Sequence, residues 1–123
     1  MVEEKILIKH KFVPMRVLEK SGKSVDLIFD IFNNTENPIL LSFDFAVPRK
    51  ALIGFDPTTT KKTISVKVKK IPPYERVSFY VTVYTTNQTP AYDYPLRYVV
   101  NYHVDNYERI LEKKVNQCSF RVV

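Results

Sequence analysis

The residues of this chain that could bind a transition metal are two histidines, one cysteine and an internal methionine: His10, His103, Cys118 and Met15. A blue-copper site uses two histidines, one cysteine and a weak axial methionine, so the inventory nominally matches. The spacing argues against such a site, because its cysteine and second histidine usually come from one loop near the C-terminus. No histidine follows Cys118. We therefore expect no metal and no cofactor.

Carboxylates are the next candidates for chemistry. Asp26 and Asp30 lie four residues apart in an alternating segment, and Asp44 occupies the same kind of position in a later one. In a strand this spacing separates the first two by about 13 Å. That is too far for a two-carboxylate acid/base pair. We expect a solvated face that pairs with Lys or Arg on neighbouring strands.

Other catalytic motifs are missing from the sequence. It has no G-x-S-x-G nucleophile motif. Its two glycines, Gly22 and Gly54, are too few for a multi-glycine phosphate loop. These observations predict a protein that is not an enzyme.

Lysines and tyrosines are the remaining candidate binding residues. Lysines cluster in KKTISVKVKK, at Lys61, Lys62, Lys67, Lys69 and Lys70. They could follow nucleic-acid phosphates, with Tyr80 and Tyr84 on the next strand stacking on bases. Outward lysines also protect an edge strand from aggregation, and exposed tyrosines are common in protein interfaces. The net charge of +6, from 19 Lys+Arg and 13 Asp+Glu, suits an anionic partner or simple solubility.

These side chains belong to segments in which apolar and polar residues alternate, the pattern of half-buried strands. The pattern predicts strands at 5–12, 25–32, 39–47, 64–70, 77–83, 96–104, 107–115 and 118–123, and a short edge piece at 51–55. We expect 15–19 to continue the first strand after Pro14. The segments 64–70 and 77–83 should pair around IPPYER. The last strands should form a hairpin through Asp105 and Asn106, although 107–115 also fits helical spacing.

A long polar connection, TTNQTPAYDYP (residues 85–95), is the most prominent expected loop. Loops held at the end of a rigid scaffold often carry recognition, so Tyr92 and Tyr94 are candidate partner-binding residues. Two Asn-x-Thr sequons, at 33–35 and 87–89, fall in expected loops and matter only if the chain is exported.

Length and composition predict one domain, residues 1–123, folded as an all-β, antiparallel two-sheet sandwich of about seven strands. A single cysteine excludes an internal disulfide. No signal peptide is visible, and the longest apolar stretch is too short for a membrane helix. We expect a cytoplasmic location as written, or an envelope-associated one after another route of export. The composition, rich in Lys, Ile, Val and Tyr, suggests an archaeal or other thermophilic source.

Three phrases in the sequence resemble those of a known class of domains. They are NNTENP (33–38), IPPYER (71–76) before VSFYVTVYT, and AYDYPLRYVV (91–100). Together they resemble the immunoglobulin-like modules of archaeal and bacterial surface and accessory proteins, such as the CARDB class, over roughly residues 24 to 104. The chain departs from that pattern at Tyr74, where the turn usually has glycine, and its tyrosine-corner spacing around Tyr92 and Tyr94 is imperfect.

The resemblance implies an immunoglobulin-like sandwich with an adhesion-like role. We therefore expect a non-catalytic binding module that recognises a protein partner through loops or an exposed sheet face. The alternative is binding of nucleic acid or an anionic surface through the lysine-rich strand 61–70, and a third reading is a cupredoxin-like metal protein. Self-association through an edge strand is a further expectation.

Overall fold

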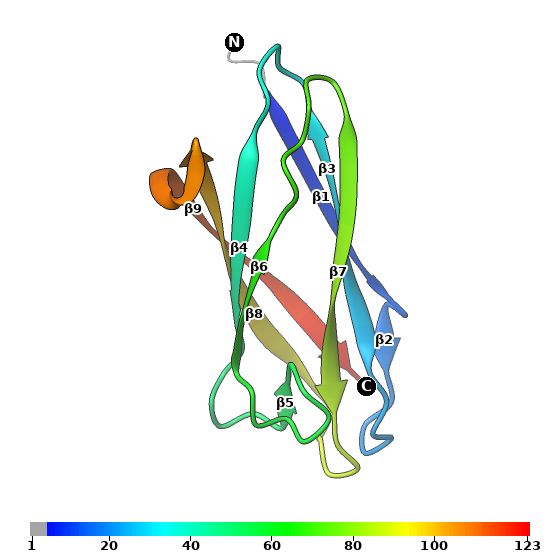
Figure 1. Cartoon of the computed structure of the whole chain (residues 1–123). Coiled ribbons are helices and arrows are strands. Elements are labelled where there is room, and N and C mark those ends of the chain that lie inside the picture. Colours follow the sequence, from blue (N-terminus) through cyan, green and yellow to red (C-terminus); the bar gives the residue numbers. More distant parts are fainter. Residues whose placement is uncertain (1–4) are drawn as a thin grey trace.

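The computed structural model describes residues 5–123, and these residues form an all-β protein. Nine strands are assigned in this range, two of which contain only two residues. In chain order they are β1 (Ile6–Val13), β2 (Arg16–Val17), β3 (Val25–Asn33), β4 (Leu40–Ala46), β5 (Ile53–Gly54), β6 (Thr63–Lys67), β7 (Arg76–Thr85), β8 (Tyr92–Val104) and β9 (Asn106–Val122) (Figure 1). The number of strands is slightly higher than the expected seven, because the two-residue strands β2 and β5 are also formed. No helix in the described part of the chain is long and apolar enough to cross a membrane.

The strands form two sheets that pack face to face. One has the order β1-β3-β7-β5 and the other the order β2-β9-β8-β4-β6. These orders match the spatial order of the ABED and GFC sheets of an immunoglobulin domain, with β6 added beside β4. The prediction of an antiparallel two-sheet immunoglobulin-like sandwich is confirmed.

Aromatic rings fill the space between the sheets. Phe29 is fully buried, and its ring centroid lies 5.1–5.5 Å from those of Phe43, Phe45, Phe79 and Tyr98. Offset and edge-to-face pairs of this kind add to the stabilisation from apolar burial. The residues predicted to share one core, Ile64, Val66, Val68, Val77, Phe79, Val81, Val100 and Phe43, all belong to this cluster or pack against it.

The first strand changes sheets at Pro14. The Val13–Pro14 peptide bond is cis, and the chain after it forms β2, which runs parallel to the end of β9 in the other sheet. The expectation that 15–19 continues the first strand is therefore wrong. The physical reason is that proline cannot donate to a sheet ladder and here redirects the chain.

The expected pairing around IPPYER is also wrong. β6 pairs with β4, whereas β7 pairs with β3 and β5 in the opposite sheet. The connection between them is therefore an arch that crosses from one sheet to the other. Its start is fixed by Asn33, whose buried amide donates to the carbonyls of Ile71 (3.0 Å) and Pro72 (3.1 Å).

The C-terminal hairpin is confirmed. β8 and β9 pair antiparallel from Tyr92 and Val122 up to the turn, so 107–115 is strand and not helix. Asp105 takes a left-handed φ of 67° at this turn. The loop before β8 is shorter than expected, because β8 already begins at Tyr92 and leaves 86–91 as the connection.

The short edge piece predicted at 51–55 is present as β5, which pairs with the end of β7. Gly54 allows the loop after β5 to fold back against it, since a Cβ there would lie 2.8 Å from the Cα of Thr59. Such a contact is too short for any side chain, so this glycine is required by the close approach of two backbone segments.

Candidate functional site

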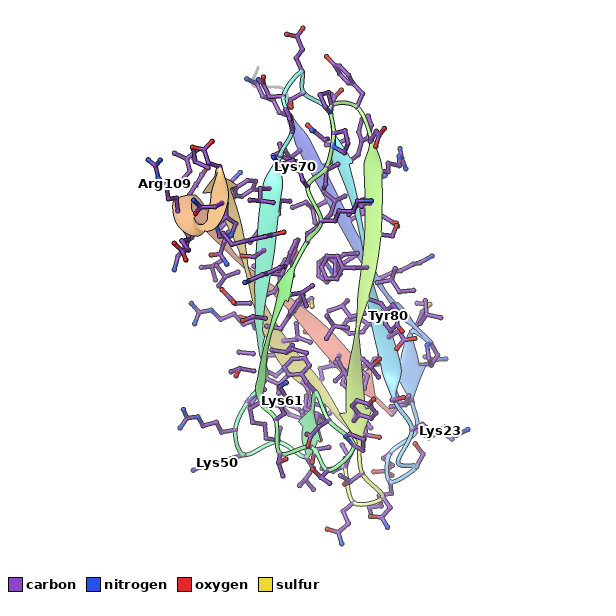
Figure 2. All side chains as sticks on the ribbon, viewed as in Figure 1. Lys23, Lys50, Lys61, Lys70, Tyr80 and Arg109 are labelled. Carbon is purple, nitrogen blue, oxygen red and sulfur yellow. The ribbon has the colours of Figure 1, made fainter. Side chains whose placement is uncertain are left out.

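The outer surface of the β1-β3-β7-β5 sheet carries aromatic and apolar side chains interspersed with charged and hydroxyl ones, among them Lys9, Lys11 and Asp30. Alternation places these residues opposite the core-facing ones on each strand. We call this surface the tyrosine face and define it by Leu7, Ile28, Phe32, Arg76, Tyr80 and Tyr84. Tyr80 is 65% exposed and projects away from β7 (Figure 2). Tyr84 lies on the same side of β7, so the structure keeps these two predicted binding residues together.

Polar groups on the tyrosine face are held in place. The hydroxyl of Ser78 donates to the carboxylate of Asp30, and that of Thr82 donates to Asp26 at 2.8 Å. The guanidinium of Arg76 lies 5.2 Å from the ring centroid of Phe32. On β7 the hydrogen-bond partners of these aspartates are hydroxyls, and on β1 Lys9 lies directly opposite Asp30.

The other two candidate tyrosines lie in the opposite sheet, at the start of β8. Tyr92 is 63% exposed, but Tyr94 is buried. The hydroxyl of Tyr94 donates to the carbonyl of Pro90 at 2.7 Å, which is the bond of a tyrosine corner. Burial raises the pKa of Tyr94. Tyr94 therefore fixes the loop from inside, and only Tyr92 is available to a partner there.

The lysine cluster does not share a surface with Tyr80 and Tyr84. β6 is an edge strand of the five-stranded sheet, so its outward side chains lie on the opposite side of the sandwich from the tyrosine face. Figure 2 shows Lys61 and Lys70 at opposite ends of this strand. The combined lysine and tyrosine surface considered for nucleic acid is not formed.

Two of the lysines make contacts within the protein. The Lys62 ammonium donates to the carbonyls of Ala51 (2.7 Å) and Ile53 (2.6 Å), and burial lowers its pKa. The Lys67 ammonium lies 5.3 Å from the ring centroid of Tyr107. Lys61, Lys69 and Lys70 are exposed. Lys62 thus stabilises the connection between β4 and β6.

The four residues of the copper hypothesis do not converge. His10, Met15 and Cys118 line one groove between the edges of β1 and β9. His103 lies on the outer surface of the other sheet, where its Nε2 is 2.7 Å from the Ser42 hydroxyl. Within residues 5–123 no group of three or more His, Cys, Asp or Glu side chains could hold a metal ion.

A polar network that was not predicted surrounds Ser42 and His103. Asn101 donates to Ser42 (3.1 Å) and to Asp44 (2.8 Å), and Ser65 donates to Asp44 at 2.6 Å. The Ser65 bond, with help from Asn101, lowers the pKa of Asp44. A Ser–His contact resembles a nucleophile and its base, but Asp44 is bonded to Asn101 and Ser65, while the other ring nitrogen of His103 lies 3.3 Å from the carbonyl of Arg109. No carboxylate in these bonds orients the imidazole.

The geometry defines an immunoglobulin-like domain with two exposed sheet faces. No protein-family model and no curated protein sequence matches the chain. A region of trypsin-activated α2-macroglobulin from Escherichia coli is similar, with a TM-score of 0.68 and 16% identity over 98% of this chain. The chain spans 7% of the length of that protein.

Two smaller solved structures match over most of their own length. AvmM, which catalyses macrocyclization in alchivemycin A biosynthesis, has a TM-score of 0.58 and 11% identity, covering 98% of this chain and 89% of that one. The ASH/PapD-like domain 7 of human CEP192 has a TM-score of 0.51 and 10% identity, covering 100% and 90%. At these identities the similarity establishes the fold alone.

Proposed function

We propose that this protein is a non-catalytic binding module that recognises a protein partner through the tyrosine face. The observation that carries the proposal is the composition of this surface. Tyr, Phe and Arg are enriched at protein interfaces, whereas Lys, Glu, Asp and Ser are depleted there. The face contains residues of both kinds, because Lys9, Asp30 and Ser78 lie among its aromatic side chains. Tyr80, Tyr84, Phe32 and Arg76 all belong to the tyrosine face.

The polar groups within the tyrosine face also suit an interface. Asp26 and Asp30 already have hydroxyl partners, so a partner would meet carboxylates whose positions are fixed. Fixed side chains lose less conformational entropy on binding than free ones.

Three exposed tyrosines in different regions provide matched variants. Tyr80 is 65% exposed on the tyrosine face, Tyr92 is 63% exposed beside the loop, and Tyr74 is 57% exposed in the arch. Each would be changed to alanine, and proteins captured by each tagged variant from the native cell would be quantified by mass spectrometry. We expect Tyr80→Ala to reduce the enriched partner by about tenfold or more, as truncation of a central aromatic does.

The outcomes separate the surfaces. Tyr74→Ala and Tyr92→Ala should retain the partner. If Tyr80→Ala and the unchanged protein captured the same amount of partner, the proposal that the partner binds the tyrosine face would be contradicted. Loss only with Tyr92→Ala would assign recognition to the loop.

Nucleic-acid binding is the second candidate, because Lys61, Lys69 and Lys70 are exposed and the net charge is +6. Charge alone gives binding that falls steeply with salt. The test is fluorescence anisotropy with a duplex and a single strand at roughly physiological salt, where the Debye length is about 8 Å. Binding that persists at this salt concentration and disappears in Lys67→Glu/Lys69→Glu would favour nucleic-acid binding. A flat titration would indicate that the lysines serve to protect the edge strand from aggregation.

A further inference from the structure

The outer edge of β9 is the largest unpaired element of the sandwich. β9 contains 17 residues, whereas strands in globular proteins usually have about 3–10. β8 pairs along one side of it, and β2 covers the other side only at Arg121 and Val122. Among residues 5–123, no other strand pairs with β9 on that side. Unpaired backbone donors and acceptors in such a row are a template for another strand.

Side chains on this segment are exposed on both faces. Val115 is 59% exposed on one face, and Lys114 and Asn116 are exposed on the other. The irregularity in the β8–β9 register falls here, because Tyr102 pairs with Glu112 and His103 with Ile110. The hairpin tip projects beyond the sandwich (Figure 1), so neither sheet blocks the approach of another chain to the edge.

If β9 pairs antiparallel with a second copy of itself, some of its acidic residues lie opposite basic residues of the other copy. Glu112 is followed by the basic residues Lys113 and Lys114, and before it Glu108 is followed by Arg109. An antiparallel neighbour of the same sequence therefore brings Glu112 of one copy towards the basic residues of the other. Opposite charges directly across a strand pair stabilise it, and like charges destabilise it.

Symmetry restricts the register further. Two copies of one strand that pair antiparallel about a two-fold axis must place each side chain opposite one on the same face of the sheet. The axis must therefore pass through a residue. With Lys113 on the axis, Glu112 lies opposite Lys114, twice, and the regular pairing ends at Leu111, which has no partner on β8. The nearby Asp44 carboxylate attracts Lys113 and offsets the repulsion between the two axial lysines.

We propose that β9 joins with β9 of a second copy of this chain, antiparallel about Lys113, to form one continuous sheet across a dimer. The dimer uses the five-stranded sheet and leaves the tyrosine face free. It is thus independent of the proposed protein partner, and Tyr80→Ala should leave self-association unchanged.

Charge exchange tests the pairing in the full chain. Sedimentation velocity across a protein concentration series should detect a dimer of the unchanged protein. Glu112→Lys alone or Lys114→Glu alone should raise the dimer dissociation constant by about tenfold, because both symmetric pairs become repulsive at once. Glu112→Lys combined with Lys114→Glu should restore the dimer. Lys69→Glu, the same substitution at an exposed site outside β9, is the control and should change nothing.

Cysteine cross-linking tests the axis. In a Cys118→Ser background, Lys113→Cys should give a covalent dimer on mild oxidation, because only the axial residue faces its own copy within disulfide range. Val115→Cys should remain monomeric on a denaturing gel. A chain that is monomeric at every concentration, a double variant that fails to restore the dimer, or cross-linking at Val115 instead of Lys113 would overturn the proposal.

Discussion

The tyrosines of this protein show how burial separates two uses of one residue type. Tyr80 and Tyr92 present most of their surface to solvent, whereas Tyr94 is buried and bonded to Pro90. The sequence predicted all of them as binding residues together with Tyr84. The sequence does not distinguish the exposed tyrosines from the buried one. The burial of Tyr94 depends on how the preceding loop folds against it, and residue type alone does not reveal this.

Replacing Phe29 or Phe79 by alanine should lower the stability of the fold by different amounts. Phe29 is fully buried and touches four aromatic rings, whereas Phe79 is half-buried. Phe29→Ala should lower the free energy of unfolding by about 3–5 kcal/mol. Phe79→Ala should cost less, because its cavity opens towards solvent. Urea denaturation of both variants checks this, and an equal or larger loss for Phe79→Ala would contradict the packing.

The thiol of Cys118 predicts a loss of stability at alkaline pH. Burial raises the pKa of Cys118 from 9.0 to about 11, so the folded state keeps a proton that the unfolded chain releases. The contribution of this thiol to the free energy of unfolding should therefore be complete below pH 9 and be lost as the pH rises to about 11. Burial also raises the pKa of Tyr94 and Tyr98, which continues the decline at higher pH.

Thermal unfolding at a series of alkaline pH values measures this effect. Cys118→Ala should flatten the first part of the decline and leave the part that belongs to the tyrosines. A profile with the same slope in the variant and the unchanged protein would show that the thiol is as accessible in the folded state as in the unfolded one.

At the scale of elements, Asn33 joins the end of β3 to the arch between the sheets. Its side-chain nitrogen donates to three carbonyls, and its oxygen accepts from the backbone and hydroxyl of Thr35. The same nitrogen is the atom that a glycan would join, so this sequon is closed in the folded protein. The Asn-x-Thr pattern alone does not indicate that the Asn33 side chain is buried.

Replacing Asn33 should therefore weaken the arch. Asn33→Ala removes its hydrogen bonds to the arch, although the carbonyls of Ile71 and Pro72 keep the backbone N–H groups of Ile39 and Glu75 as donors. It should lower the free energy of unfolding by about 1–2 kcal/mol. Asn34→Ala, the exposed neighbour, should stay within about 0.5 kcal/mol of the unchanged protein. Equal effects of the two substitutions in urea denaturation would show that the Asn33 bonds do not hold the arch.

The strands themselves were largely predictable, because alternation reports which side chains face a core. The partners of each strand were less so. Alternation is identical whether β6 and β7 pair with each other or lie in opposite sheets, and Pro72 and Pro73 suit a tight turn as well as an arch. Tyr74 takes a φ of 59° in this connection, a left-handed conformation for which the sequence offers no glycine.

At the scale of the whole molecule, the two sheets give the protein separate surfaces. The tyrosine face lies on one side, and the lysines of β6, the polar network around Asp44 and the free edge of β9 belong to the other sheet. The lysines and tyrosines belong to neighbouring segments of the chain, so the sequence predicted one combined surface. The fold separates them, since consecutive strands alternate between sheets from β4 to β8.

The central claim, that a partner protein contacts the tyrosine face, is tested most directly by site-specific photo-crosslinking in the native cell. A benzophenone amino acid would replace Tyr80, Tyr74 or Tyr92 in turn, and adducts would be identified after irradiation. We predict that position 80 forms an adduct with another protein and that positions 74 and 92 do not. Adducts at position 74 or 92 with none at position 80 would contradict the claim.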